Sequence, residues 1–532
     1  MTVLSMCQKA CLGHARAPVG SRLVCPSSPL KRQFQHCHPP SSCERRVDGM
    51  RRRTFLGGLS ASALATGTAS LSFGQVAAKR LTMPPLLDAT SSGQVRLEAQ
   101  KGRTAFVGSS RADTWGFNQP FLGPTLRMST GRATQVDVLN SLDEEISVHW
   151  HGLLVPGTVD GGPHQTVAPA TTWSPELELT QPAATAWYHS HIHGATARQV
   201  QMGLAGVLQI DDGQDDARGL PSQYGVDDLT LVLQDRRFSR RGEIDLSLTM
   251  PDRMMGFLGD TILVNGQVGT MAVVPKGLVR LRLLNGSNAR IYTLALSDGR
   301  PMHLVATDSG YLDKPTRLSK LRLSPGERFE VLVDFSDARD VTLTSEHNPN
   351  TGMMGGMMGG RRQQSGRFSV LPFTVDPTLP TRITRQPDDL GGSRPNGDAA
   401  NAIWRRLSLD MPMGMGMMLG RSDRRFSING DAFAMGRINF RVTQGTIERW
   451  TVNADMMMHP FHVHGVKFQV LSENGRAPQR QNTGWKDTVL VNGSVDLLIR
   501  FDQPAPANAP FMYHCHILEH EDGGMMGQFI VG

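Results

Sequence analysis

Histidine is the residue type whose spacing stands out in this chain of 532 residues. Ten of its 17 histidines stand in four short clusters, and each cluster contains a His-X-His pair. A lone histidine is more often a hydrogen-bonded core or surface residue than a ligand, but four such pairs are hard to explain in that way. Neutral imidazole binds copper, zinc and iron, so the pairs predict more than one metal ion. The ten residues are His149, His151, His189, His191, His459, His462, His464, His514, His516 and His520.

The last cluster, HCHILEH, indicates which metal is bound. On a β-strand, residues i and i+2 point to one face and the residue between them points to the other. Cys515 therefore faces a different site from its neighbours His514 and His516. A thiolate with two imidazoles and a distant thioether is the blue-copper electron-transfer set. His459, Cys515, His520 and Met525 can supply it, and Met526 is the alternative thioether.

The segments that must position these residues are short apolar runs separated by Gly, Pro, Asn and Asp, with hardly any helical periodicity. Such spacing is typical of Greek-key β-sandwiches and predicts an all-β fold. One unit recurs in TLRMSTGRATQVDVLNSL, MAVVPKGLVRLRLLNGS and INFRVTQGTIERWTVNA, which predicts three copies of one domain. We expect them at residues 79–220, 221–375 and 401–532, with a linker at 376–400.

The N-terminal region differs from the rest of the chain. Residues 1–78 hold ten of the 55 Lys and Arg residues but only two of the 48 Asp and Glu residues, so the remainder is close to neutral. This balance argues against a nucleic-acid partner. We interpret 1–49 as an upstream extension and 50–78, with Arg52-Arg53-Thr54-Phe55-Leu56, as a twin-arginine signal peptide. The alternative, a membrane anchor, is disfavoured because the stretch is rich in Gly, Ser and Thr.

Cysteine usage and the methionine-rich segments add two further expectations. Five of the six cysteines lie within residues 7–43, so the body of the chain has no internal disulfide. Two segments, TGMMGGMMGG at 351–360 and MPMGMGMMLG at 411–420, alternate Gly with Met. They are either adaptable core filler or exposed loops, and we favour exposed loops because glycine has no side chain to pack. Thioether sulfur is a soft ligand that selects Cu(I).

The four histidine motifs, in this order, resemble the copper-binding motifs of the multicopper oxidases from about residue 100 to the C-terminus. The flanking stretches VPGTVDGGP, GLAGVLQI, SENG and GWKDTV are most similar to the periplasmic copper-efflux (cuprous) oxidases. That branch also has a twin-arginine leader and Met-rich loops. The resemblance implies three consecutive cupredoxin-like Greek-key β-sandwich domains, and four copper ions: one of type 1, one of type 2 and two of type 3.

Carried over residue by residue, the resemblance implies three ligand sets. His459, Cys515 and His520 would bind the type 1 copper, with Met525 axial. His149 and His462 would hold the type 2 copper. His193 extends the second motif but has no ligand role in the family. The type 3 pair would be held by His151, His189, His191, His464, His514 and His516.

The same resemblance implies the reaction. Electrons would enter one at a time at the type 1 copper, and O2 would take four of them and leave as water. Protons are also needed, and Asp160 and Glu521 match acidic relay positions in the family. Their alternatives are a turn aspartate and a solvated glutamate. Asp455 and Met457, just before His459, match residues that hold a cuprous substrate ion in the copper-efflux branch.

The leading hypothesis is therefore a monomeric periplasmic enzyme, exported by the twin-arginine machinery without a membrane anchor. It would oxidise Cu(I), together with small organic donors, with O2 as the electron acceptor, and so serve copper tolerance. A laccase-like oxidase of phenols is the alternative among enzymes, and a copper-sequestering periplasmic binder is the alternative outside them. The copper-free cell-division relative resembles these enzymes in fold but lacks the ligands, all of which this chain keeps. Two-domain copper nitrite reductases are disfavoured by the length of the chain.

Overall fold

The computed structural model describes residues 79–350, 366–392, 399–400, 402–411 and 426–532. The predicted upstream extension, the signal peptide, the Met-rich segment 351–360 and all but Met411 of the Met-rich segment 411–420 lie outside the described residues. All described residues belong to one unit, Gly74–Gly532. Within them, no helix is long and apolar enough to cross a membrane.

The first sandwich contains two sheets. One has the order β4-β3-β6-β7, with β8 beside β6, and the other has the order β2-β5-β10-β9. Strand β6 alternates buried and less buried residues along its length, as expected for a strand with one face on a core. The strands are β2 (Leu86–Asp88), β3 (Gln94–Thr104), β4 (Ala112–Phe117), β5 (Thr125–Ser129), β6 (Ala133–Asn140), β7 (Thr172–Trp173), β8 (Glu176–Glu178), β9 (Ala184–His189) and β10 (Ala205–Asp211).

The second sandwich contains two six-stranded sheets, β12-β11-β14-β19-β16-β17 and β1-β13-β21-β20-β15-β18. β14 lies between β11 and β19 and is buried along its whole length. The strands are β1 (Lys79–Arg80), β11 (Asp228–Arg236), β12 (Thr261–Val264), β13 (Thr270–Val274), β14 (Leu278–Asn285), β15 (Tyr292–Leu296), β16 (Met302–Thr307), β17 (Gly310–Leu318), β18 (Leu321–Leu323), β19 (Arg328–Asp334), β20 (Val341–Glu346) and β21 (Arg367–Val375).

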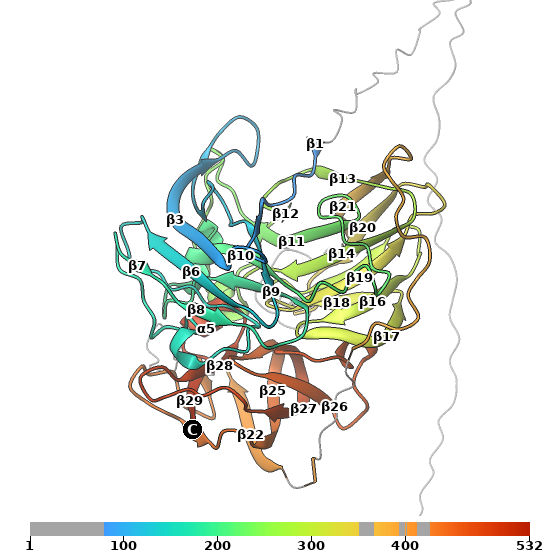
Figure 1. The fold of residues 1–532 in the computed structure, drawn as a ribbon. Coiled ribbons are helices and arrows are strands. Elements are labelled where there is room, and N and C mark those ends of the chain that lie inside the picture. Colours follow the sequence, from blue (N-terminus) through green and yellow to red (C-terminus); the bar gives the residue numbers. More distant parts are fainter. Residues whose placement is uncertain (1–78, 351–365, 393–398, 401, 412–425) are drawn as a thin grey trace, which may run out of the picture. The chain divides into compact units, whose positions relative to one another are not determined.

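The third sandwich is one connected set of eight strands with the order β23-β22-β25-β28-β29-β24, in which β27 pairs with both β25 and β26. The strands are β22 (Ile403–Asp410), β23 (Ser427–Ile428), β24 (Phe440–Val442), β25 (Ile447–Val463), β26 (Lys467–Glu473), β27 (Thr488–Arg500), β28 (Phe511–Cys515) and β29 (Met526–Val531). Figure 1 shows the three sandwiches in blue to green, green to yellow, and orange to red.

Helices are few and short in the described chain: α1 (Thr196–Met202), α2 (Met250–Met255) and α5 (Leu518–Asp522), with 3-10 turns η1 (Gly157–Val159) and η2 (Arg480–Asn482). Each sandwich has its own apolar core. In the third, Trp450 is fully buried against the rings of Phe440 and Phe529. The predicted all-β fold of three cupredoxin-like domains is confirmed, while the exact domain boundaries stay predictions.

Strand β25 contains the irregularity that matters most for the site. Its residues 447–454 alternate between partly and fully buried and pair with β27 up to Ala454. Pairing then breaks and resumes at His459, so residues 455–458 form a bulge opposite Asn492. A bulge bends its strand and re-aims the side chains that follow. The motif DMMM therefore leaves the sheet, while His459 returns to the interior.

Candidate metal centre

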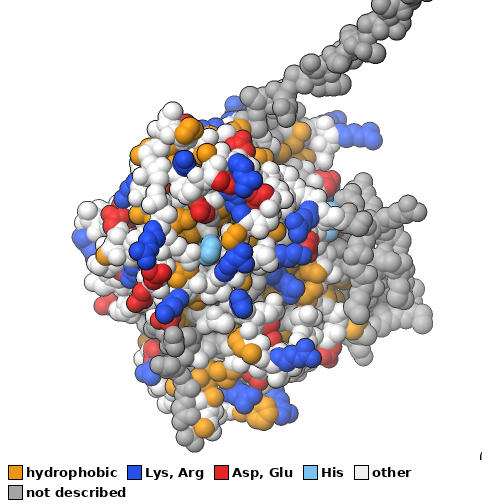
Figure 2. Space-filling view, turned by 90° about the vertical axis from the view of Figure 1, so that its right-hand side faces the viewer, with side chains coloured by type: hydrophobic (Ala, Val, Ile, Leu, Met, Phe, Trp, Pro, Cys, Tyr) orange, Lys and Arg blue, Asp and Glu red, His pale blue; other side chains and the backbone are white. Residues whose placement is uncertain are grey.

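The ten clustered histidines are buried, each with at most 1% of its side chain exposed. Strand register brings the first members of the His-X-His pairs together. His149 and His189 face each other and exchange backbone hydrogen bonds of 2.9 and 3.2 Å, and His462 lies opposite His514 on β25 and β28. None of these histidines therefore contributes to the surface drawn in Figure 2, where basic and acidic side chains are interspersed.

Eight of these histidines form three groups, two of which share His151, and within each group the ring nitrogens lie within 4.8 Å of one another. The structure thus brings together every histidine predicted for the type 2 and type 3 coppers. The first and third sandwiches supply all of them. The groups are His151, His189 and His516; His191, His464 and His514; and His149, His151 and His462.

The hydrogen bonds of these rings leave lone pairs that face one another. Nδ1 of His149 lies 3.0 Å from the Asp160 carbonyl oxygen, and Nδ1 of His462 lies 2.9 Å from the Asp487 carbonyl oxygen. A carbonyl only accepts, so both Nδ1 atoms carry the hydrogen and both Nε2 atoms are bare. Those Nε2 atoms lie 3.4 Å apart. Two opposed lone pairs repel unless a cation binds both, so this pair fits a metal ion.

The other two groups fit a metal ion equally well. The Nε2 atom of His514 lies 3.3 Å from that of His191 and 3.2 Å from that of His464. In the remaining group, Nδ1 of His151, Nε2 of His189 and both ring nitrogens of His516 are buried without a hydrogen-bond partner in the described structure. Buried polar atoms rarely stay unpaired, so these nitrogens are suited to ligate metal.

Burial sets the protonation of these rings. Desolvation, reinforced by neighbouring imidazoles, holds the pKa values of six of them well below the usual value for histidine. Neutral imidazole is the form that binds metal, so the rings are ready to bind at neutral pH. The six are His151, His189, His191, His464, His514 and His516.

A separate group contains the cysteine. The Cys515 Sγ atom lies 3.3 Å from Nδ1 of His459 and 3.7 Å from Nδ1 of His520, and these two nitrogens are 3.3 Å apart. Met525 is fully buried, and its carbonyl accepts a hydrogen bond from the Cys515 amide. Burial raises the pKa of the Cys515 thiol well above its usual value, so a thiolate needs a cation beside it. This set suits a soft, copper-type ion.

The two imidazole rings of this group have different surroundings at Nε2, the nitrogen that points away from Cys515. Nε2 of His520 lies 3.0 Å from the Met254 carbonyl at the end of α2, and Phe426 stacks on the same ring. Nε2 of His459 has no hydrogen-bond partner among the described residues. Of the residues predicted to hold a cuprous ion, Asp455 is exposed and Met457 is half-buried on the bulge before His459.

The two predicted relay acids lie against the histidine groups. Asp160 is buried, and its Oδ2 lies 2.8 Å from Nδ1 of His464 and 3.4 Å from Nδ1 of His149. Glu521 on α5 is also buried, with its two carboxylate oxygens each 3.3 Å from an Nδ1, one of His191 and one of His514. Burial, and then Asp522, raises the pKa of Glu521 well above its usual value. The burial of Glu521 argues against a solvated glutamate, whereas Asp160 stands at the end of the turn η1 and also contacts the histidines.

Sequence reasoning missed a third acid. Asp487, at the end of the GWKDTV stretch, is buried with its Oδ1 atom 3.1 Å from Nε2 of His151. It forms a two-pronged ion pair with Arg328 of the second sandwich, at 2.7 and 2.6 Å. The only signal for Asp487 in the sequence was the resemblance of that stretch, which assigned no role to the residue.

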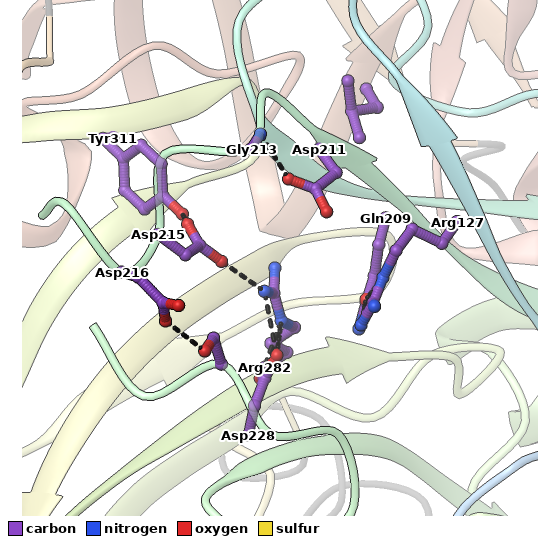
Figure 3. Close-up of a pocket in the computed structure, with 11 residues that line it drawn as sticks. Arg127, Gln209, Asp211, Gly213, Asp215, Asp216, Asp228, Arg282 and Tyr311 are labelled. Atoms are coloured by element: carbon purple, nitrogen blue, oxygen red, sulfur yellow. Dashed lines mark hydrogen bonds and ion pairs between the residues drawn. The ribbon is translucent and has the colours of Figure 1, made fainter. Parts of the chain in front are cut away.

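A cavity of about 240 Å³ lies elsewhere, between the first and second sandwiches (Figure 3), and none of the predicted ligands lines it. Its charged groups already pair with each other. Arg282 binds Asp228 at 2.8 Å and Asp215 at 3.4 Å, and Arg127 binds Gln209. This arrangement joins two sandwiches and leaves few groups free for a ligand.

Comparisons with known proteins agree with the geometry. Family profiles described as multicopper oxidase match residues 98–215, 234–351 and 406–532. The Cell division protein FtsP of Xenorhabdus nematophila is 38% identical over 90% of this chain and 98% of that protein. Two solved structures are also similar to the chain. The laccase-like multicopper oxidase CueO of Ochrobactrum sp. is 41% identical, with a TM-score of 0.79 over 85% of this chain and 100% of that one. The Campylobacter jejuni multicopper oxidase, described as a metallo-oxidase, is 27% identical, with a TM-score of 0.74 over 85% and 95%.

Proposed function

Because the chain belongs to the multicopper oxidase family, we propose that it is a cuprous oxidase that uses O2 as its electron acceptor and serves copper tolerance. Copper, when bound, supplies one-electron redox chemistry at the cysteine group and four-electron reduction of O2 to water at the histidine groups. His459, Cys515, His520 and Met525 would hold the type 1 ion. His149 and His462 would hold the type 2 ion, and the other six histidines would hold the type 3 pair.

One observation carries this proposal: the cysteine group and the histidine groups share a three-residue stretch of backbone. Cys515 belongs to one group, while its direct neighbours His514 and His516 belong to two of the others. A covalent path therefore connects the two kinds of centre. In a binder that only sequesters copper, no feature would require this connection.

Asp160 and Glu521 would supply protons for the reduction of O2. The raised pKa of Glu521 keeps a proton on its carboxyl group at pH values where an ordinary glutamate has lost it. That proton lies beside Nδ1 of His191 and Nδ1 of His514. Asp160 accepts from Nδ1 of His464 with Oδ2, while its Oδ1 is buried without a hydrogen-bond partner. Both acids are therefore placed to pass protons towards the histidine groups.

The surroundings of the two imidazoles in the cysteine group support Cu(I) as the substrate. The His520 ring is covered by the Met254 carbonyl and Phe426, which leaves the His459 ring as the side for electron entry. Asp455 and Met457, on the bulge that precedes His459, offer a hard carboxylate and a soft thioether, a combination suited to an ion that enters as Cu(I) and leaves as Cu(II).

Both Met-rich segments begin next to the third sandwich. Asn350, the residue before the first segment, exchanges two hydrogen bonds of 3.0 Å with the backbone of Met458. Met411, which opens the second segment, packs against the apolar core of the third sandwich, as Met457 does. The described residues that adjoin the two segments thus lie against the sandwich that holds His459 and Cys515.

The test uses the exported, copper-loaded chain. Metal analysis should find about four copper ions per chain with an intense blue absorption, the signature of thiolate-bound copper. Cu(I) should drive O2 uptake, whereas a laccase-like enzyme would oxidise phenols without added copper, and a sequestering binder would hold copper without consuming O2. Export through the twin-arginine pathway would be checked by replacing Arg52 and Arg53 with Lys and measuring periplasmic protein.

A role in cell division is a second candidate because the curated relatives at 38% identity are named cell division proteins. That role would not require the twelve predicted ligands. A chain with Cys515→Ser that still corrects a division defect but no longer confers copper tolerance would separate the two roles.

A further inference from the structure

The second sandwich supplies none of the predicted ligands, yet one of its side chains reaches all three sandwiches. Arg328, the first residue of β19, is fully buried. A guanidinium group has five N–H donors, and all five are used here. Nε donates to the Thr185 carbonyl in the first sandwich at 3.0 Å. Nη1 and Nη2 donate to the Gly326 and Asp308 carbonyls at 3.0 and 2.9 Å, and both also bind Asp487.

Because Arg328 holds its carboxylate, Asp487 in turn orients a histidine. Its Oδ1 accepts from Arg328 and lies 3.1 Å from Nε2 of His151. A carboxylate only accepts hydrogen bonds, so Nε2 of His151 carries the hydrogen and Nδ1 is left as a bare lone pair. That Nδ1 atom is buried with no hydrogen-bond partner in the described structure.

His151 is thereby turned the opposite way from its neighbours. Five of the other rings hydrogen-bond an oxygen atom through Nδ1 and leave Nε2 for the shared site, and Asp487 gives His151 the reverse orientation. A group that fixes the other nitrogen of a ligating histidine sets its tautomer and its direction. The five rings are those of His149, His189, His462, His464 and His514.

The backbone next to His151 is shaped around the same ion pair. Gly152 has φ of +94°, and a Cβ atom there would collide with the Arg328 guanidinium and lie 3.0 Å from Asp487 Oδ2. At Gly326, whose carbonyl Arg328 binds, a Cβ atom would lie 2.8 Å from the His516 ring. Two glycines thus allow the ion pair and the imidazoles to approach closely.

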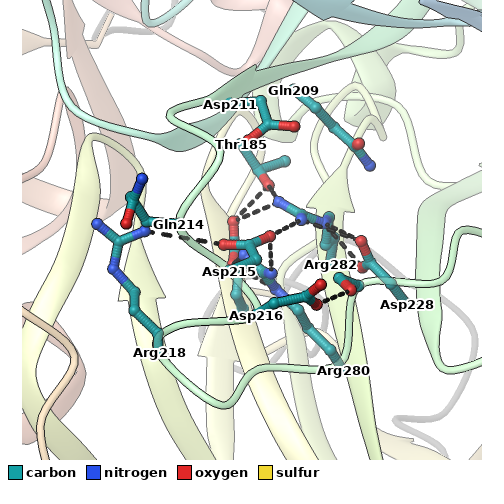
Figure 4. Close-up of polar contacts among 12 residues, drawn as sticks. Thr185, Gln209, Asp211, Gln214, Asp215, Asp216, Arg218, Asp228, Arg280 and Arg282 are labelled. Atoms are coloured by element: carbon teal, nitrogen blue, oxygen red, sulfur yellow. Dashed lines mark hydrogen bonds and ion pairs between the residues drawn. The ribbon is translucent and has the colours of Figure 1, made fainter. Parts of the chain in front are cut away.

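A buried network of charged side chains also holds the Arg328–Asp487 ion pair in place. Lys486 Nζ lies 3.0 Å from Asp308 and 3.1 Å from Glu327, and the Arg328 amide donates to Asp308. On β19, Glu330 shares a face with Arg328 and accepts a 2.6 Å hydrogen bond from Thr185 Oγ1. Figure 4 shows Thr185 beside Arg282, which binds Glu330 together with Arg280. Strand β19 is therefore fastened to β9, which ends in His189.

We propose that Arg328 is a positioning residue of the histidine centre: it holds Asp487 in the one orientation that makes His151 present Nδ1 to the metal. The second sandwich thus acts on a site to which it contributes no ligand. This inference rests on the trinuclear part of the proposed function and is independent of whether Cu(I) is the donor.

The test compares copper-loaded Arg328→Lys and Asp487→Asn with the unaltered chain. Lysine keeps the charge but loses the two-pronged geometry, and asparagine keeps the shape but loses an acceptor. Both should keep the blue absorption of the Cys515 centre, which lies in the third sandwich. Total copper should fall, with weaker retention against a chelator by roughly 10- to 100-fold. The electron paramagnetic resonance signal should reveal copper ions that are no longer coupled.

Arg282→Lys is the matched control. Arg282 is also buried where the second sandwich contacts the first, but it contacts neither Asp487 nor a histidine. It should lower the unfolding temperature and leave copper retention unchanged. Equal copper loss in Arg282→Lys and Arg328→Lys, loss of blue absorption in parallel with the other coppers, or unaltered retention in Arg328→Lys would each overturn the positioning role. If the unaltered chain shows neither blue absorption nor coupled copper, the proposed function fails, and this inference fails with it.

Discussion

The Nε2 atom of His520 lies 3.0 Å from the carbonyl oxygen of Met254, so a helix end of the second sandwich closes one side of the cysteine group. The equivalent atom of His459 has no such partner among the described residues. The two imidazoles beside Cys515 are therefore unequal, and electron donors should approach from the His459 side.

Replacing Asp455 with Ala together with Met457 with Leu should lower kcat/KM for Cu(I) by roughly tenfold, about 1.4 kcal/mol of transition-state stabilisation. The cause is the loss of the carboxylate and the thioether from the bulge that precedes His459. Turnover of a bulky phenol should stay the same. Met456→Leu, on the same exposed bulge, serves as the control for a general effect of substitution there. If the double variant oxidises Cu(I) at the original rate, these two residues do not hold the donor.

Deleting residues 411–420 should lower Cu(I) oxidation and leave or raise the turnover of bulky organic donors. The chain would lose the thioether groups that this segment is proposed to offer to Cu(I), a soft ion, whereas an organic donor does not need them. Oxygen uptake with each donor measures the effect. Parallel loss of both activities would argue against Cu(I) as the substrate.

Cys515→Ser should remove the blue absorption and abolish Cu(I) oxidation, because serine does not supply a thiolate. The histidine groups should keep their copper, so the metal content should fall by about one ion per chain. Metal analysis and visible spectra check this. Residual oxidation at the original rate would show that electrons do not enter through the Cys515 centre.

Glu521→Gln should lower kcat for O2 reduction by roughly 100-fold, since the amide has no acidic proton to give. The pKa of Glu521 is raised, so the carboxyl group is protonated below that value and loses its proton as the pH rises through it. Turnover in the unaltered chain should therefore fall on the alkaline side, and the variant should lose this dependence. Blue absorption should be equal in both chains. An unchanged pH profile in the variant would remove Glu521 from the relay.

Glu330→Gln should destabilise the metal-free protein by about 1.5–3 kcal/mol at pH 7, because Arg280 and Arg282 would lose one of the buried carboxylates that they bind, while Asp215 and Asp228 remain. Burial raises the pKa of Glu330, but the two arginines outweigh burial and lower it below the usual 4.5. Its contribution to stability is complete above that value and is lost as the pH falls through the lower pKa of the folded chain.

Denaturant unfolding of the metal-free protein at pH 7 and at acidic pH measures this contribution. The difference between the variant and the unaltered chain should shrink as the pH falls. The control is Glu346→Gln, which breaks an exposed ion pair with Lys320 and should cost at most about 1 kcal/mol. Equal effects of the two substitutions would contradict the assigned role of the buried network.

The sequence was sufficient to predict the fold class and which histidines converge, because the alternation of short strands and the His-X-His spacing are local patterns. It could not reveal Asp487, whose role depends on Arg328, a residue 159 positions away in the chain. The closure of His520 by Met254 is equally distant in sequence, at 266 positions. The second histidine of a pair also lies just beyond its strand, as at His191 and His516, where local alternation no longer governs direction.

The bulge in β25 separates the residues proposed to bind the electron donor from the metal ligand His459 on the same strand. Pairing with β27 resumes at His459, so the ligand takes its position from the sheet and not from the four residues before it. Those residues lie outside the regular pairing, opposite Asn492, so their side chains can be changed while the length of the bulge is kept. Preference for a different electron donor could therefore be engineered, or acquired by natural variation, at positions 455–458 alone while the metal chemistry behind them is preserved.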